Sequence, residues 1–296
     1  MSNAVKEQAS APKYKKQSQL AETWKRLCRN KTAVLGLIIV VLLILIAIFS
    51  PVIFNYEETV IKQNYGEAKQ WPSSAHPFGT DELGRDILAR VCYGSRASLS
   101  ISVITVACAL TLGTILGSLA GYYGGKVDMI IMRIMDVFLA IPGTLLAICI
   151  VAALGTGTSK LVIALTVSTV PTFSRIIRGS VLTVRDVEYI EAARAIGARD
   201  STIIFSHVLP NCLAPIIVQT TLKIADIILT IAGLSFLGLG IQPPTPEWGS
   251  MLSNGRTFIR DYSYMTMFPG LAIMITILSL NLLGDGLRDA LDPRLR

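Results

Sequence analysis

Residues 32–54 read TAVLGLIIVVLLILIAIFSPVIF, a run of 23 positions without a charged side chain. As a helix rising about 1.5 Å per residue, this segment is roughly 34 Å long, and the hydrocarbon core of a bilayer is about 30 Å thick. Eight Lys and Arg residues precede it, and no small-x-small cleavage site follows it. The segment is therefore predicted to be a membrane-spanning helix and not a cleaved signal peptide.

The composition extends this prediction to the whole chain. Of its 296 residues, 52% are hydrophobic and 16% are charged, and the mean hydropathy of +0.56 is too high for an ordinary soluble domain. Five further apolar segments follow, at about 97–120, 129–154, 161–178, 213–239 and 266–284. Six spans predict an all-α integral membrane protein whose two termini lie on the same side.

The distribution of positive charge predicts the orientation in the membrane. Eighteen of the 27 Lys and Arg residues lie on the side of the termini, eight lie on the other side, and Lys223 lies within a span. Because cytosolic segments carry the excess of these residues, the tails 1–31 and 287–296 and the polar loop 181–212 are predicted to be cytosolic, and the loop 55–96 extracytoplasmic. The net charge of +7 follows from this topology and from contact with anionic membrane lipids, and it gives no reason to expect nucleic-acid binding.

The sequence indicates no enzymatic or metal site. A phosphate-binding loop requires Gly-x-x-x-x-Gly-Lys-Ser/Thr, and the segments around Lys126 and Lys160 lack its spacing and its hydroxyl. Two histidines and five cysteines have no metal-ligand spacing, and the cysteines are interpreted as reduced, apolar packing residues. We therefore expect no catalytic residue, cofactor or metal in this chain, and expect ATP hydrolysis to come from another polypeptide.

The polar loop between the fourth and fifth spans carries a pattern of small and turn-forming residues: Glu191, Ala192, Ala193, Gly197, Leu209 and Pro210. The alanines keep a short helix thin enough to enter a partner's cleft, and Gly197 lets the backbone turn without a Cβ penalty. Asp200 and Ser201 are then expected to cap a second short helix that ends at Pro210. Glu-Ala-Ala alone would also fit an ordinary amphipathic helix-turn-helix.

With its spacing and its membrane context, this pattern resembles the loop by which binding-protein-dependent ABC permeases dock their ATPase. Further motifs resemble the dipeptide/oligopeptide/nickel branch of these permeases: HPFGTDELGRD at 76–86 with YGSRASL at 93–99, RIMD at 133–136 with Ile141-Pro142, LSFLGLGIQPPTPEWG at 234–249, and NLLGDGLRDALDPR at 281–294. The resemblance implies a type I ABC importer permease (MetI-like) fold, with residues 97–286 as its core. Only residues 1–31 and 55–75 fall outside the recognisable pattern.

The same resemblance implies a function and a set of partners. The chain would be the transmembrane permease subunit of an ATP-driven importer of short peptides, acting with a second homologous permease, two cytosolic ABC ATPases and an extracytoplasmic solute-binding protein. Closure of the ATPases would move the loop around Glu191, tilt the spans and open the pathway outward. Nickel or another small solute is the alternative cargo. An ATPase-independent secondary transporter or channel is the alternative of another class, and it would need intramembrane coupling charges and no docking loop.

Polar side chains inside the spans are the candidates for lining the pathway. They are Thr166, Thr169 and Thr172 in the fourth span and Asp226 in the fifth. The threonines could line a wet pathway or donate hydrogen bonds to neighbouring backbone, as such residues do in lipid. Asp226 could equally form a structural ion pair with Lys223, as Arg133 could with Asp136, because charges in spans are usually paired.

Two further local patterns carry structural expectations. Residues 80–92 are expected to form an amphipathic helix on the outer membrane surface, with Asp86 and Arg90 paired across one turn. Gly113, Gly117 and Gly121 recur at four-residue spacing in the second span. They predict a close approach of another helix, either within this subunit or at the interface with a second permease.

Overall fold

The computed structural model describes residues 19–291, so the outer parts of the two predicted tails, 1–18 and 292–296, lie outside the described residues. The described chain is built from helices: α1 (Gln19–Leu27), α2 (Lys31–Ile53), α3 (Ile87–Tyr123), α4 (Gly125–Leu139), α5 (Gly143–Leu154), α6 (Thr158–Val184), α7 (Glu188–Ala195), α8 (Asp200–Thr202), α9 (Leu213–Phe236), α10 (Trp248–Gly255) and α11 (Tyr264–Leu291). Two π-helical segments cover Tyr56–Ile61 and Ile203–Val208. Shorter 3-10 turns cover Tyr65–Glu67, Leu209–Cys212 and Arg256–Phe258.

Five helical stretches in this part of the chain are long and apolar enough to cross a membrane: α2, α3, α6, α11 and the stretch Asp200–Phe236 that ends with α9. A sixth span requires α4 and α5 to be counted together, and these two helices meet at an angle of 84°. The span predicted over 129–154 is therefore not one continuous helix but two helices separated by a bend. Pro142 has no backbone N–H and disfavours helical geometry at the residue before it, so the helix ends near Leu139 and a new one starts at Gly143.

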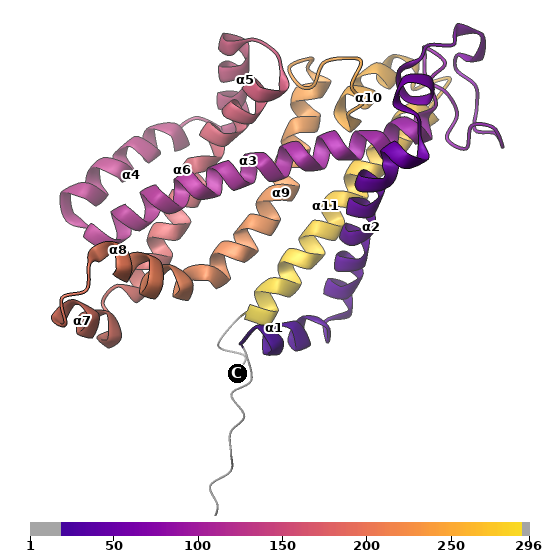
Figure 1. Ribbon diagram of the computed structural model, residues 1–296. Helices are drawn as coiled ribbons and strands as arrows, with labels where there is room; N and C mark the ends of the chain where they lie inside the picture. The colour runs from indigo at the N-terminus through magenta and orange to yellow at the C-terminus, as the bar shows by residue number, and fades with distance from the viewer. Residues whose placement is uncertain (1–18, 292–296) are drawn as a thin grey trace, which may run out of the picture.

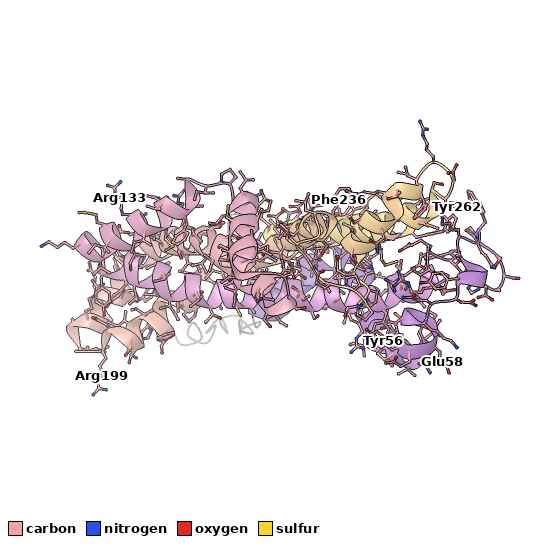
Figure 2. All side chains as sticks on the ribbon, turned by 90° about the horizontal axis from the view of Figure 1, so that it is seen from above. Tyr56, Glu58, Arg133, Arg199, Phe236 and Tyr262 are labelled. Carbon is pink, nitrogen blue, oxygen red and sulfur yellow. The ribbon has the colours of Figure 1, made fainter. Side chains whose placement is uncertain are left out.

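The long helices form a tilted bundle with two distinct ends (Figure 1). Helix α3 packs along α6, while α11 packs against both α2 and α9. At one end lie α7, α8, α1 and the last turn of α11, and at the opposite end lie α5, α10 and the segment between α2 and α3. Seen from above, Arg133 and Arg199 mark one extremity of the elongated molecule and Tyr56, Glu58 and Tyr262 the other (Figure 2).

The three glycines of α3 face α6, which confirms the predicted close approach and places it within this subunit. A Cβ atom on Gly113 would lie 2.5 Å from Cβ of Phe173, and one on Gly117 would lie 2.5 Å from the carbonyl oxygen of Ser174. On Gly121 it would lie 2.8 Å from a side-chain atom of α6. Only glycine permits this separation of the two helix backbones.

The expected surface helix over 80–92 is wrong in its first half, because α3 begins only at Ile87 and then continues for 37 residues. Before it, the carboxylate of Asp81 accepts hydrogen bonds from the N–H groups of Leu83 and Arg85, both at 2.9 Å. Gly84 turns the backbone with φ of +75°. An aspartate side chain that satisfies nearby backbone donors offers the chain an alternative to the helix, so these residues form a turn.

The expected Asp86–Arg90 pair is also wrong. Asp86 caps α3 by accepting a hydrogen bond from the N–H of Ala89 at 2.8 Å, and its other oxygen lies 2.8 Å from Nδ1 of His76. Arg90 is buried and donates instead to the carbonyl oxygen of Val60 at 2.8 Å. Two contacts, Asp86 with His76 and Arg90 with Val60, therefore hold the start of α3 against the preceding segment.

Of the two ion pairs considered inside the spans, one forms. Nζ of Lys223 lies 2.9 Å from Oδ2 of Asp226. Asp136 pairs across helices with Arg175 of α6, with Nη2 and Oδ1 2.7 Å apart, and not with Arg133. The Lys223–Asp226 pair is confirmed and the Arg133–Asp136 pair is wrong, because α4 packs against α6 and places Asp136 within reach of Arg175.

All five cysteines are free thiols, as expected, but their environments differ. Cys212 is buried and fits the packing interpretation, whereas Cys28, Cys108 and Cys149 are exposed on this chain. The interpretation as buried packing residues is therefore wrong for these three.

Candidate functional site

Helix α7 confirms the short helix expected around Glu191-Ala192-Ala193. Its first turn carries Glu188 and Glu191 and its last turn carries Arg194, so the charges complement the helix dipole at both ends. The helix ends where Gly197 adopts φ of +78°, and the N–H of Ala198 then donates to the carbonyl oxygen of Ala193 at 3.1 Å. This left-handed residue after a helix is the position that glycine occupies most easily, so the predicted turn at Gly197 is confirmed.

One face of α7 is buried and the other is exposed. Ile190 and Ala193 are buried in the main apolar core, which also includes Ile203 and Val208 from the segment after α8. Glu191 and Ala192 lie on the exposed face. The helix is thus held from one side and presents its small residues on the other.

Two large apolar side chains near α7 are strongly exposed. Ile196 is 85% exposed and Phe205 is 67% exposed, although both belong to a polar loop between two spans. Exposed apolar side chains in a polar setting mark surfaces that bind another protein or a membrane. Neither residue was among the predicted docking residues, although an apolar side chain in a polar loop is a signal that the sequence contains.

The expected second helix does not end at Pro210. From Asp200 the chain passes through the π-helical segment Ile203–Val208 and the 3-10 turn Leu209–Cys212 directly into α9. Pro210 falls where the hydrogen-bond pattern changes, so its missing N–H does not interrupt the helical stretch. Leu209 and Pro210 therefore join the loop to a membrane-spanning helix.

A side-chain cluster fastens this loop to the end of α3. The hydroxyl of Tyr122 donates to Oδ1 of Asp200 at 2.9 Å, and Nε of Arg194 donates to the same hydroxyl oxygen at 3.4 Å. The guanidinium of Arg194 also lies 5.0 Å from the centre of the Tyr122 ring. The N-cap position of α8 is Arg199, so the expected capping role of Asp200 is wrong and its carboxylate serves this cluster instead.

Two arginines, Arg178 in α6 and Arg185 directly after it, join this region to α4 and α3. Arg178 forms a bidentate ion pair with Asp128 of α4, with Nη2 and Oδ2 2.6 Å apart. Nη1 of Arg185 donates to the carbonyl oxygen of Gly121 at 2.9 Å. The adjoining ends of α3, α4 and α6 and the loop around α7 thus form one connected unit.

The four pathway candidates do not share one surface. Thr166 and Thr169 are buried within this chain, and the hydroxyl of Thr169 donates to the carbonyl oxygen of Leu165 at 2.7 Å. Thr172 is half-buried, and the side chain of Asp226 is 63% exposed. Of the four candidates, only Thr172 and Asp226 are therefore accessible from outside the subunit.

At the opposite end of the bundle, a buried carboxylate joins α10 to α3. Glu247 is 1% exposed, and its two oxygens accept hydrogen bonds from the N–H groups of Gly249 and Ser250, both at 2.8 Å. The hydroxyl of Ser98 donates to it at 3.4 Å. Burial raises the pKa of Glu247, and these hydrogen bonds oppose the shift. Sequence reasoning missed this residue, although it is the sole charge in the motif at 234–249.

Comparison with known families identifies the architecture that these contacts build. Residues 113–296 match the family described as binding-protein-dependent transport system inner membrane component. The chain belongs to this family. Residues 18–72 of the permease also match the N-terminal TM domain of oligopeptide transport permease C.

Two relatives are similar to the permease over nearly their whole length. The dipeptide transport system permease protein DppC of Alkalihalophilus pseudofirmus is 50% identical over 277 residues, which cover 93% of this chain and 90% of the relative. The glutathione transport system permease protein GsiD of Pectobacterium atrosepticum is 46% identical over 275 residues, covering 93% and 91% of the two chains.

Solved structures show the same fold. One chain of the inward-facing MetNI methionine ABC transporter matches with a TM-score of 0.57 at 19% identity, and the match covers 69% of this chain and 96% of that one. A chain of an amino acid ABC transporter matches with a TM-score of 0.53 at 13% identity, covering 68% and 94%. The all-α fold of a type I ABC importer permease is therefore confirmed. As a member of this family, the chain is a multi-pass membrane component that works with ATPase and substrate-binding partners.

Proposed function

We propose that this permease moves short peptides across the cytoplasmic membrane, and that the loop around α7 is the surface on which its ATPase docks. The full-length similarity to a dipeptide permease and to a permease for glutathione, itself a tripeptide, supports a peptide cargo. The chain would supply the pathway and no ATPase site of its own.

One observation carries the docking assignment. The exposed residues Glu191, Ala192, Ile196 and Phe205 project from a loop that is fastened to α3 and continuous with α9. A partner that grips this surface therefore acts on two membrane-spanning helices at once. A loosely tethered loop would yield instead of moving the helices.

The contacts support a mechanism of alternating access. When two ATPases close on ATP, a push on α7 passes through Tyr122 to α3 and along the stretch Asp200–Phe236 to α9. Helix α3 runs on to the other end of the bundle, where Glu247 and Ser98 connect it to α10. The tilt of α3 and α9 would then open the pathway outward and close it at the docking end.

The assembly would contain a second homologous permease, two ATPases and an extracytoplasmic solute-binding protein. The pathway would lie between the two permeases, with Thr172 and Asp226 as the candidates in this chain that remain accessible. A cavity of about 800 Å³ beside the docking loop is lined by Gly179 and Thr183 of α6 and by Asn211, and it fits the inner mouth of such a pathway.

The proposed topology follows the positive charge and the two ends of the bundle. The tails 1–31 and 287–296 and the loop 181–212 would be cytosolic, the segment 55–96 extracytoplasmic, and 32–54 and 97–286 would supply the spans. An impermeant thiol reagent added to intact cells should label a cysteine introduced at exposed Lys62, in a variant without native cysteines, and spare one at exposed Ile196. Labelling of the Ile196 position from outside would overturn this orientation.

The docking role is tested by replacing Ile196 and Phe205 with Asp in the full complex. We expect the permease to insert normally while the ATPase no longer co-purifies and substrate-stimulated ATP hydrolysis is lost. Tyr65→Asp is the matched control, because Tyr65 is 68% exposed at the opposite end of the molecule. Normal ATPase attachment in the double variant would refute the docking surface, and uptake that continues without any ATPase would favour a secondary transporter.

The cargo is tested by deleting the gene. Deletion should confer resistance to toxic peptide analogues and abolish growth on peptides as the source of a required amino acid. Unchanged peptide use, together with a nickel-dependent activity that falls and recovers with excess nickel, would replace the peptide by the metal.

A further inference from the structure

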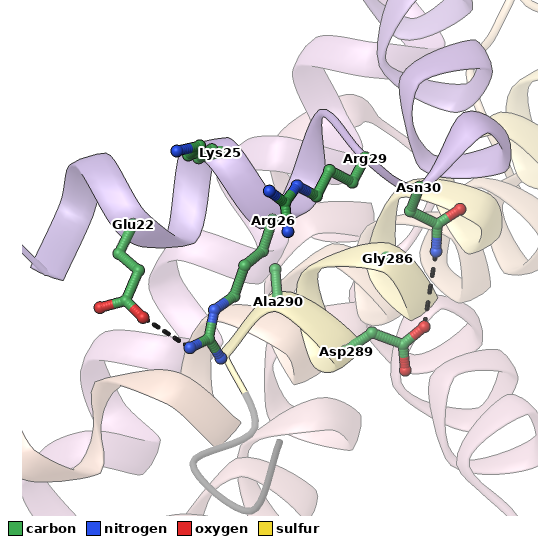
Figure 3. A pocket seen from close by; sticks show the side chains of 8 residues that line it. All are labelled: Glu22, Lys25, Arg26, Arg29, Asn30, Gly286, Asp289 and Ala290. Carbon is green, nitrogen blue, oxygen red and sulfur yellow. Dashed lines mark hydrogen bonds and ion pairs between the residues drawn. The ribbon is translucent and has the colours of Figure 1, made fainter. Parts of the chain in front are cut away.

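A cavity of about 460 Å³ lies where α1 meets the start of α2 and the end of α11 (Figure 3). Leu27 of α1 is buried against Ala33 of α2 and Ala290 of α11. Asn30 caps α2 by accepting a hydrogen bond from the N–H of Thr32 at 3.1 Å. These contacts hold α1 across the ends of the two membrane-spanning helices, so the cavity has a defined shape.

The cavity is lined by three basic and two acidic residues, and only one of the basic residues forms an ion pair with an acidic one. Arg26 pairs with Glu22 at 2.6 Å, and Asp289 accepts a hydrogen bond from Asn30 at 3.5 Å. Figure 3 shows both contacts, and neither involves Lys25 or Arg29. Within residues 19–291, Lys25 and Arg29 form no ion pair. Two cations beside the cavity are thus available to an outside anion.

The position of α1 places these cations at the level of the lipid headgroups. Helix α1 directly precedes α2, a 23-residue helix that is long and apolar enough to cross a membrane, and lies at its end (Figure 1). Trp24 of α1 is 57% exposed, and tryptophan side chains favour the interface between membrane and water. Basic residues at this depth attract the phosphate groups of anionic lipids, and arginine matches phosphate oxygens in bidentate geometry.

Acyl-chain contact is available on α2, which begins two residues after Arg29. In the first turns of α2, Leu35 and Ile38 are 53% and 57% exposed on this chain. A lipid whose phosphate occupied the cavity could therefore lay its chains along α2. Free phosphate would gain nothing from that surface.

We propose that Lys25 and Arg29 bind the phosphate of an anionic phospholipid in the cavity between α1 and the end of α11. The bound lipid bridges α1 to the membrane beside α2 and so holds α1 against α11. The site requires only that α2 spans the membrane, and it stands whichever solute the permease carries.

The test uses the purified complex in nanodiscs made from equal amounts of phosphatidylglycerol and phosphatidylcholine. The complex is then extracted in mild detergent, and the ratio of the two retained lipids is measured. Wild type should be enriched in phosphatidylglycerol. Lys25→Gln and Arg29→Gln should each reduce the enrichment by about fivefold, because one basic residue near an anionic membrane contributes about 1 kcal/mol. Arg29→Lys should retain most of it.

The controls separate this site from general charge effects. Lys62→Gln with Arg260→Gln removes two exposed cations at the other end of the molecule and should leave the ratio unchanged. ATPase content reports whether each variant complex remains assembled. Inorganic phosphate in excess should not displace the retained lipid. Equal enrichment in the double variant Lys25→Gln/Arg29→Gln and wild type would overturn the proposal, as would residue-dependent binding of inorganic phosphate without lipid enrichment.

Discussion

Replacing Tyr122 with Phe removes one hydroxyl from the cluster that joins α3 to the docking loop and leaves the ring in place. The variant loses the hydrogen bond to Asp200 at 2.9 Å and the longer one from Arg194 at 3.4 Å. A hydrogen bond to a charged group contributes about 1.5–3 kcal/mol. Because Asp200 and Arg194 are exposed and regain water, we take a value around and below the lower limit of this range, about 1–2 kcal/mol. The attached form of the loop should then lose about five- to thirtyfold in population relative to the detached form.

This loss should appear as uncoupling. In proteoliposomes that hold the complete complex and binding protein, Tyr122→Phe should bind the ATPase as wild type does. It should transport fewer solute molecules per ATP hydrolysed, because a detached loop moves without α3. The measurement is the ratio of the two initial rates at saturating substrate. Tyr65→Phe, which removes a hydroxyl at the opposite end of the molecule, should leave the ratio unchanged.

A double-mutant cycle identifies the partner. Asp200→Ala alone should lower the ratio similarly, and the double variant Tyr122→Phe/Asp200→Ala should be little worse than either single variant. If Tyr122→Phe couples as well as wild type, or if the two changes are additive, the cluster does not transmit the movement and the reasoning is refuted.

Three further changes test the structure at separate points. Gly117→Ala should lower the free energy of unfolding by about 1–3 kcal/mol, because its Cβ would lie 2.5 Å from a backbone oxygen of α6, while Gly233→Ala, with nothing within 4 Å, should cause no loss in the same thermal assay. Gly197→Val should lower the free energy of unfolding by about 1–2 kcal/mol through the positive φ alone, since no atom of the chain lies within 4 Å of an added Cβ, and Gly197→Asn should lower it less. If the ATPase contacts this turn, both variants should weaken its attachment. Normal ATPase attachment in both would argue against that contact. Because burial raises the pKa of Glu247, its contribution to stability is present below the ordinary pKa of a carboxyl group and is lost as the pH rises through the raised pKa. The midpoint temperature of unfolding should therefore fall more with rising pH in wild type than in Glu247→Gln. Parallel pH profiles of the two proteins would contradict this.

Several features of the permease could be predicted from the sequence because their signals are local. Length and apolarity predict most of the spans, and the small residues of 188–197 predict both the helix α7 and the turn after it. The glycine spacing in α3 predicts a close helix approach, although the sequence left open whether the partner was α6 or another subunit. Each of these depends on neighbouring residues or on a single helix face.

Other features depend on which segments meet in space. Tyr122 and Asp200 are 78 positions apart, and neither has a sequence pattern that predicts their contact. Asp136 pairs with Arg175, 39 positions away, because α4 packs against α6. Glu247 is buried because α10 packs onto α3, and Thr166 and Thr169 are buried because α6 turns that face inward.

The sequence by itself therefore determined that this chain crosses the membrane several times and carries a helix of small residues in a polar loop. The tertiary structure decided where one span breaks, where α3 begins, which charges pair and which polar groups remain accessible. The physical reason is that helix formation and membrane insertion follow from the free energy of short segments, whereas a hydrogen bond or an ion pair forms only when packing brings both partners within about 3–4 Å.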